Sequence, residues 1–343
     1  MIREAARGFL QDWYASGKGP ERIYQNGTGN DPKAWKTFAQ EMGMTGIAID
    51  EIYGGAGLGD LGRVVIMEEL GASLCSIPFL TTCGIAADII SAFATQDIKT
   101  ELLTQIAAGE LTAVYCDGHD AKGAKVSNVV NAASVDIILL SRYAADGIEL
   151  IAINSDAAGL DIQSKTTMDP TRNFANLTWK NVEKQNIKVV GRTTKPDLEK
   201  IVRQSFIGLA AECVGGAQQC LDMTLEYASQ RVQFDRPIAS FQAIKHRCAD
   251  MFILIQAARS AVYAAALAHE EDKTEAALIA KAYASDAFFK VAGDAIQLHG
   301  GIGFTWEYPL HFFFKRARAN RIMFGNSSRD YDRLADEIFG DAA

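Results

Sequence analysis

Three long segments near the C-terminal end place apolar residues at helical spacing, and they constrain the fold more than any other feature of the chain. They cover residues 198–231, 244–270 and 274–298, and a short polar turn joins the last two. Helices of this length that are linked by short turns pack as antiparallel neighbours and bury their apolar stripes against one another. The pattern therefore predicts a helical bundle.

The remaining sequence falls into two zones of different character. Residues 1–112 show helical spacing, apart from a glycine-rich interruption at 46–57 that is unfavourable in a helix interior. The middle zone has short runs of β-branched and aromatic residues separated by Gly, Asn and Asp, which is typical of a small antiparallel β domain. The expected strands are 126–130, 136–141, 148–153, 160–164 and 174–179.

These patterns predict a mainly α fold with a central β domain. We expect an N-terminal helical domain at 1–112, a shortened middle β domain at 113–192 and a C-terminal bundle at 193–343. A chain of 343 residues is long enough to bury a core in each.

The composition excludes several classes of function. The net charge of −8, without a basic cluster, argues against nucleic-acid binding. No apolar run is long enough to span a membrane, and the charged N-terminus does not resemble a secretory signal, so we expect a cytoplasmic protein. The six cysteines are scattered without metal-ligand spacing, and we expect them to be buried and reduced.

Four groups of motifs occur along the chain in a defined order. They are 41–47 with 53–58 and 68–71; 227–238 with 241–251; 297–306; and 325–327. Together they resemble the acyl-CoA dehydrogenase family over nearly the whole chain. The resemblance implies an N-terminal helical domain, a small antiparallel β domain and a C-terminal four-helix bundle.

The resemblance also implies FAD as the cofactor. A planar arginine fork suits the two negative charges of its pyrophosphate, and glycines without a Cβ let backbone N–H groups approach it closely. In this family the corresponding arginine and glycine loop reach across a dimer interface to a neighbouring chain's FAD. Taken singly, such residues are more often a solvated charge or a turn. The expected contacts are Arg231, Phe234, Gln242, Gln297, Gly300, Gly301, Asn326 and Ser327.

The family's catalytic base is missing from its usual places. The reaction removes a proton from Cα of an acyl-CoA thioester while a hydride leaves Cβ for the flavin, and the base is a carboxylate in a dry pocket. In this sequence Phe324 occupies the usual glutamate position. The alternative position used by some members falls near Ser205 and Phe206, and neither is a carboxylate.

Three other carboxylates are weaker candidates for the base. Glu212 lies seven residues beyond Ser205 and could be a displaced base, although a salt-bridged helix glutamate is the simpler interpretation. Asp330 and Asp332 follow the turn and are expected to face solvent.

The β domain also departs from the family pattern. The stretch 112–122 lacks the Thr-Glu-Pro segment that contacts flavin and substrate, and Val130-Asn131 stands where a Thr-Asn pair is usual. The chain's own flavin-ring and substrate contacts are thus weakened, whereas the residues expected to reach a neighbour's FAD remain.

This division suggests the non-catalytic subunit of a heteromeric acyl-CoA dehydrogenase. A partner subunit of the same fold would hold the acyl-CoA and the glutamate, as in the bacterial heterotetramers (α₂β₂) that act on CoA thioesters of steroid side chains. The resemblance further implies an electron-transfer flavoprotein as the acceptor. Two alternatives stay open: a self-sufficient dehydrogenase that uses Glu212 as its base, and a non-enzymatic scaffold on the same fold.

Overall fold

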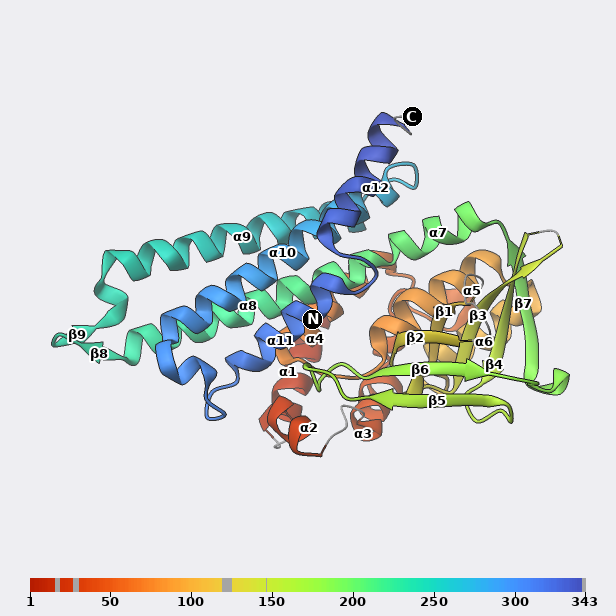
Figure 1. Ribbon diagram of the computed structural model, residues 1–343, viewed down its shortest axis with the longest axis horizontal. Coiled ribbons are helices and arrows are strands. Elements are labelled where there is room, and N and C mark those ends of the chain that lie inside the picture. Colours follow the sequence, from red (N-terminus) through yellow and green to blue (C-terminus); the bar gives the residue numbers. More distant parts are fainter. Residues whose placement is uncertain (16–18, 27–30, 119–124, 146, 341–343) are drawn as a thin grey trace. The chain divides into compact units, whose positions relative to one another are not determined.

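The computed structural model describes residues 1–15, 19–26, 31–118, 125–145 and 147–340 (Figure 1). The chain forms two compact units that do not follow chain order. The bundle unit consists of Met1–Asn26, Val64–Cys75 and Phe206–Ala343, and the sheet unit consists of Gly27–Arg63 and Ser76–Ser205. The division into three domains at residues 112 and 192 stays a prediction.

Three long helices, α8, α9 and α10, run alongside one another in the bundle unit (Figure 1). Their shared core includes Ile255 and Val262 of α9 and Leu278 and Phe288 of α10, all fully buried. The predicted helical bundle is therefore present. The helices of this unit are α1 (Ile2–Trp13), α2 (Pro20–Asn26), α8 (Phe206–Gln230), α9 (Gln242–Ala266), α10 (Lys273–His299), α11 (Leu310–Ile322) and α12 (Ser327–Phe339), with the larger part of α4 (Gly59–Ser73).

Two glycines allow α4 and α8 to touch backbone to backbone. A Cβ on Gly71 would lie 2.1 Å from the carbonyl oxygen of Glu212, and a Cβ on Gly215 would lie 1.8 Å from that of Glu68. No side chain fits at such distances, so the absence of a Cβ at both positions sets the separation of the two helices.

The segment 198–231 is divided in the structure. Helix α7 (Lys195–Gln204) ends before Ser205, and α8 begins at Phe206. The expected single helix is therefore two helices, because apolar spacing continues through a break that only the backbone reveals. Helix α7 belongs to the sheet unit.

The sheet unit contains two sheets. One has the order β1-β3-β4-β7 and the other β2-β6-β5; the β1–β3 pair is parallel and the other described pairs in these sheets are antiparallel. All five expected strands are present, and β1 and β7 add to them. The strands are β1 (Ala113–Asp117), β2 (Lys125–Val130), β3 (Ile137–Ala144), β4 (Gly147–Asn154), β5 (Leu160–Lys165), β6 (Phe174–Trp179) and β7 (Ile187–Thr193).

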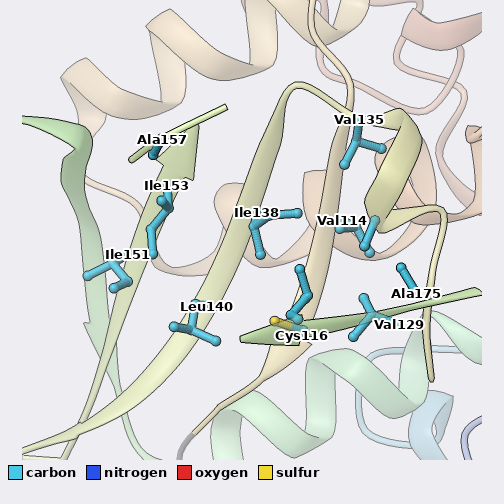
Figure 2. Close-up of a cluster of buried hydrophobic side chains, with 12 residues drawn as sticks. Val114, Cys116, Val129, Val135, Ile138, Leu140, Ile151, Ile153, Ala157 and Ala175 are labelled. Atoms are coloured by element: carbon cyan, nitrogen blue, oxygen red, sulfur yellow. The ribbon is translucent and has the colours of Figure 1, made fainter. Parts of the chain in front are cut away.

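Buried side chains from both sheets form one core (Figure 2). Ile138 and Leu140 of β3 pair in register with Ile153 and Ile151 of β4, and all four belong to this cluster. Because successive strand residues point to opposite faces, the alternate positions share one buried face. The helices of this unit are α3 (Pro32–Lys36), which continues as a π-helix over Thr37–Glu41, the π-helix Leu80–Ala86 with α5 (Ala87–Phe93), α6 (Gln96–Ala107) and α7.

All six cysteines are free and buried, as expected. Within the described ranges, every helix is too short or too polar to cross a lipid bilayer. The same ranges hold no group of three or more His, Cys, Asp or Glu side chains arranged to bind a metal.

Candidate functional site

Arg231 stands at the start of a β-hairpin that joins α8 to α9. Strands β8 (Val232–Gln233) and β9 (Arg236–Pro237) are connected by Phe234 and Asp235, whose φ values of 54° and 59° are those of a tight hairpin turn. The Arg231 N–H donates to the Tyr227 carbonyl at 2.9 Å, which continues the hydrogen bonding of α8. The Arg231 side chain is exposed and forms no ion pair with any described residue.

Aromatic contacts hold the hairpin against the start of α9. Phe234 is 86% exposed, and its ring meets the edge of the Phe241 ring with centroids 6.1 Å apart. The Arg236 guanidinium lies 4.1 Å from the centroid of the Phe241 ring, a cation–π geometry. Gln242 is the first residue of α9 and is also exposed.

The second part of the candidate site follows the end of α10. Gln297, Gly300 and Gly301 are exposed, and a 3-10 turn covers Gly300–Phe304. Gly300 has φ 64°, which favours glycine. A Cβ on either Gly300 or Gly301 would meet no atom within 4 Å, so the described chain leaves open space beside this turn.

A stack of rings brings the two parts together. The Tyr227 and His299 rings stack with centroids 4.3 Å apart, and Tyr308 contacts the imidazole at 4.7 Å. Since Tyr227 precedes Arg231 by one helical turn and His299 precedes Gly300, both parts lie at the same end of the bundle (Figure 1). This end carries six of the expected residues: Arg231, Phe234, Gln242, Gln297, Gly300 and Gly301.

Asn326 and Ser327 lie elsewhere in the bundle unit. The Asn326 side chain caps α12 by accepting from the Arg329 N–H at 2.9 Å, and the buried Ser327 donates to Asp286 Oδ1 at 3.1 Å. Asp286 lies thirteen residues before His299 in α10, which corresponds to about 20 Å along the helix. The structure thus separates these two expected contacts from the other six.

Two aromatic rings that touch, those of Phe324 and Phe206, lie at or next to the two positions expected for the base. Phe324 has φ 61°, and its ring stacks on that of Phe206 with centroids 5.4 Å apart and planes inclined by 12°. The left-handed region is unfavourable for a bulky residue, so neighbouring contacts must hold Phe324 there. Neither ring can accept a proton.

A buried ion pair provides these contacts. Lys281 Nζ donates to the Gly325 carbonyl and to Asp330 Oδ2, the latter at 2.5 Å, and both charged side chains are fully buried. Arg333 Nη1 donates to the Phe324 carbonyl at 3.4 Å and to Asp330 Oδ1 at 3.2 Å. The expectation that Asp330 faces solvent is wrong, because a lysine of α10 draws its carboxylate inward.

The exposure of Asp332 agrees with the sequence-based expectation. Glu212 is buried, and its Oε1 accepts from Arg316 Nη1 at 2.7 Å and from Asn320 Nδ2 at 3.2 Å. Glu212 is thus a salt-bridged glutamate between α8 and α11. A carboxylate paired with a guanidinium is stabilised in its charged form and is a poor acceptor for a substrate proton.

A carboxylate that was not predicted from the sequence contacts Ser205. Ser205 Oγ donates to Asp88 Oδ2 at 3.1 Å, while Arg63 bonds both Asp88 oxygens at 2.8 and 2.6 Å and Asp60 Oδ1 at 2.8 Å. Burial raises the pKa of Asp88, and the Arg63 charge opposes this rise. Ser205, Asp88 and Arg63 are far apart in sequence, so no local motif marks the cluster.

The altered β-domain positions have structural roles. Thr112 donates to Asp136 Oδ2 through its backbone N–H at 2.8 Å and its hydroxyl at 2.7 Å. Asn131 is buried with φ 60°, and its Nδ2 donates to Thr81 Oγ1 at 3.4 Å. Residues 119–122 of the altered stretch lie outside the described residues.

The sequence matches known proteins along its whole length. Residues 1–110 match the model "Acyl-CoA dehydrogenase, N-terminal domain", and residues 202–339 match "Acyl-CoA dehydrogenase, C-terminal domain". The acyl-CoA dehydrogenase IpdE2 of Mycolicibacterium smegmatis is 33% identical over 99% of this chain and 98% of its own length. The chain belongs to the acyl-CoA dehydrogenase family. The expected fold class is thereby confirmed.

Solved structures of this family superimpose on nearly the whole chain. A variant of the steroid ACAD Tcur3481-Tcur3483 is 27% identical with a TM-score of 0.83, and the match covers 99% of this chain and 97% of the other. The ChsE4-ChsE5 complex of Mycobacterium tuberculosis is 22% identical with a TM-score of 0.87, covering 100% and 98%. The second likeness supports the acyl-CoA dehydrogenase fold alone.

FAD is the cofactor of the acyl-CoA dehydrogenase family, and the exposed end of the bundle fits it. Arg231 makes no hydrogen bond or ion pair through its side chain among the described residues, so its five donors are available to a phosphate. The space beside Gly300 and Gly301 leaves their backbone open to a phosphate or ribose. Bound FAD would supply the hydride acceptor of the family's reaction.

Proposed function

We propose that this chain is the non-catalytic subunit of a heteromeric, FAD-dependent acyl-CoA dehydrogenase. The complex would introduce an α,β double bond into an acyl-CoA thioester, and this chain would complete the FAD site of a partner subunit of the same fold. The Phe206–Phe324 stack carries the proposal, because it puts apolar rings at Phe324 and at Phe206, next to Ser205, where the family's carboxylate is expected.

The exposed end of the bundle supports the second part of the proposal. Arg231, Gly300 and Gly301 are accessible and make few contacts in their own chain. An exposed guanidinium without an ion-pair partner among the described residues can bind a phosphate that is held mainly by another chain. The guanidinium would bind the pyrophosphate, and the glycine turn would offer its backbone N–H groups.

Other expected contacts have more limited roles in this proposal. Phe234, Gln242 and Gln297 would border the same end of the flavin. Asn326 and Ser327 would form a second contact region beside Phe324, although both side chains already bond within the bundle. The proton acceptor and most of the acyl-CoA pocket would belong to the partner, and an electron-transfer flavoprotein would reoxidise the complex.

One comparison supports the assembly and the substrate class. The name Tcur3481-Tcur3483 joins two components, and that protein is described as a steroid ACAD. We infer a heterotetramer with two copies of each subunit and a CoA thioester of a steroid side chain as the substrate.

The test compares the chain alone with the chain co-expressed with an acyl-CoA dehydrogenase-fold protein from the same genome that has a glutamate at the position of Phe324 or Ser205. We expect little flavin absorbance near 450 nm in the isolated chain and a yellow complex that is bleached by acyl-CoA. Arg231→Ala should release FAD from the complex, whereas Arg192→Ala, at an exposed arginine of β7, should retain it. Stoichiometric FAD and bleaching in the isolated chain would contradict the proposal, and a colourless complex would favour the scaffold alternative.

The self-sufficient alternative needs Glu212 to act as a base. Its ion pair with Arg316 and its bond from Asn320 oppose that role, since both stabilise the charged carboxylate in a fixed orientation. No described contact favours this alternative over the heteromeric one.

A further inference from the structure

The two halves of the proposed FAD-binding end are connected through Tyr227 and His299. We propose that these two are positioning residues, which fix the separation between Arg231 and the Gly300–Gly301 turn so that both can meet one FAD. The FAD part of this inference rests on the proposed function. The positional part concerns the chain itself and can be tested without a cofactor.

Each of the two rings is attached closely to one half of the site. Tyr227 lies one helical turn before Arg231, and its carbonyl accepts the Arg231 N–H at 2.9 Å. His299 is the last residue of α10 and precedes Gly300 directly. A displacement of either ring therefore moves the backbone that carries an FAD-binding group.

The contact between the rings is a nearly parallel stack. The centroids of Tyr227 and His299 are 4.3 Å apart with planes inclined by 21°, and Tyr227 Oη donates to the His299 carbonyl at 3.4 Å. Tyr308 packs against the imidazole at 4.7 Å and donates from Oη to the Met223 carbonyl at 3.4 Å. The imidazole is thus held between one tyrosine of α8 and another that follows the glycine turn.

His299 is suited to a packing role in a neutral state. It is 3% exposed, and burial lowers the pKa of the imidazole below its ordinary value. Nδ1 lies 2.7 Å from the Ala295 carbonyl, so the neutral ring donates its single proton there. A buried neutral ring with a fixed orientation can act as a rigid spacer between α8 and the turn.

The turn itself has little other support on its outer side. Gly300 and Gly301 are exposed, and the space where a Cβ would stand is empty at both. Their place is therefore set mainly through the residue before them and the 3-10 turn after them, where Thr305 bonds the Ile302 carbonyl. Loss of the stack should loosen the glycines before it unfolds the helices.

Hydrogen exchange of the isolated chain tests whether the Tyr227–His299 stack fixes the position of the Gly300–Gly301 turn. Tyr227→Leu removes the ring, and Tyr227→Phe keeps the ring while removing only the hydroxyl. We expect amides of 299–304 to exchange faster in the leucine variant and nearly as in the wild type in the phenylalanine variant, with α8 unchanged in both. Unchanged exchange of 299–304 in Tyr227→Leu would overturn the inference.

The rate of FAD release from the co-expressed complex tests whether this separation matters for FAD binding. We expect Tyr227→Leu to speed FAD release by about tenfold, because small displacements of binding groups cost large factors, while Tyr227→Phe stays close to wild type. His299→Phe, which keeps a ring but loses the bond to Ala295, should lie between them. Matching thermal unfolding of the isolated Tyr227 variants would separate positioning from general stability.

Arg231→Ala is the reference that distinguishes the two hypotheses. If it releases FAD while Tyr227→Leu retains FAD at the wild-type rate, the positioning inference is overturned and the proposed function survives. If Arg231→Ala leaves FAD release unchanged, the proposed function fails in its FAD part, and the exchange experiment still decides whether Tyr227 and His299 fix the turn.

Discussion

The ring of Phe324 lies flat against the ring of Phe206, with centroids 5.4 Å apart and planes inclined by 12°. One residue belongs to the turn before α12 and the other begins α8, and they are 118 positions apart in the sequence. The contact joins the two places where the acyl-CoA dehydrogenase resemblance predicts a base. It is an apolar contact where a dehydrogenase site requires a charge.

Replacing Phe324 by glutamate should therefore destabilise the chain instead of producing a dehydrogenase. Contact with the Phe206 ring should raise the pKa of the new carboxyl, so the folded state would bind its proton more tightly than the unfolded state. The penalty, of about 1–3 kcal/mol, should then grow as pH rises from 5 to 8. Urea unfolding at both pH values measures this, with Phe324→Leu as an apolar control. Flavin reduction by acyl-CoA in the isolated Phe324→Glu chain would contradict the prediction.

Removing the charge of Lys281 should be costly because Asp330 is fully buried. Lys281→Met leaves that carboxylate paired with Arg333 and takes a donor from the Gly325 carbonyl. We expect a loss of about 3 kcal/mol in the free energy of unfolding. The double variant with Asp330→Leu should recover much of it. If the single and the double variant were equally unstable, the unpaired Asp330 carboxylate would not explain the lower stability of Lys281→Met.

Glu212 offers a test that separates structure from catalysis. Glu212→Gln keeps a hydrogen-bond acceptor for Asn320 but leaves the Arg316 charge buried without its carboxylate. Unfolding should become easier by about 2–4 kcal/mol, while a complex that still assembles should keep its rate of acyl-CoA oxidation. An active wild-type complex that loses its activity on this change, with FAD and assembly intact, would restore Glu212 as the base.

His311 should make the stability of the chain depend on pH. It is 7% exposed, and burial, with the charge of Lys315 as a smaller cause, lowers the pKa of the imidazole to about 4. The unfolded state has the ordinary value of about 6.5 and takes up a proton first on acidification, so stability is present above pH 6.5 and is lost as pH falls toward 4. We expect the free energy of unfolding to fall by about 1–3 kcal/mol over this range. His311→Leu should remove it, and an unchanged pH profile in that variant would assign the effect to other groups.

The fold was largely predictable from the sequence because its signals are local. Apolar spacing located α9 and α10, and short runs of β-branched and aromatic residues located β2 to β6. The break at Ser205 was not predicted, because the apolar spacing continues across it and no residue type there marks a change in the backbone. Strands β1 and β7 mix apolar and polar residues. They are recognised as strands from their pairing with β3 and β4.

The candidate site was predictable only in part. Arg231 and Gly300 belong to recognisable motifs, whereas the contacts that place them join distant positions. The Tyr227–His299 stack spans 72 residues, and the Lys281–Asp330 pair spans 49. Asp330 was assigned to solvent because an aspartate after a turn is usually exposed. No residue near Asp330 in the sequence indicates that a buried lysine lies beside it.

Gly301 is a residue that its own chain does not constrain, although it would contribute to the proposed FAD site. Its φ lies outside the left-handed region, and no atom of the described chain would oppose a methyl group there. Gly301→Ala should consequently leave the expression and the thermal unfolding of the isolated chain unchanged. In the proposed complex its effect would appear only after assembly, so a mutational map of the single chain would classify the position as neutral even if FAD binding by the complex required it.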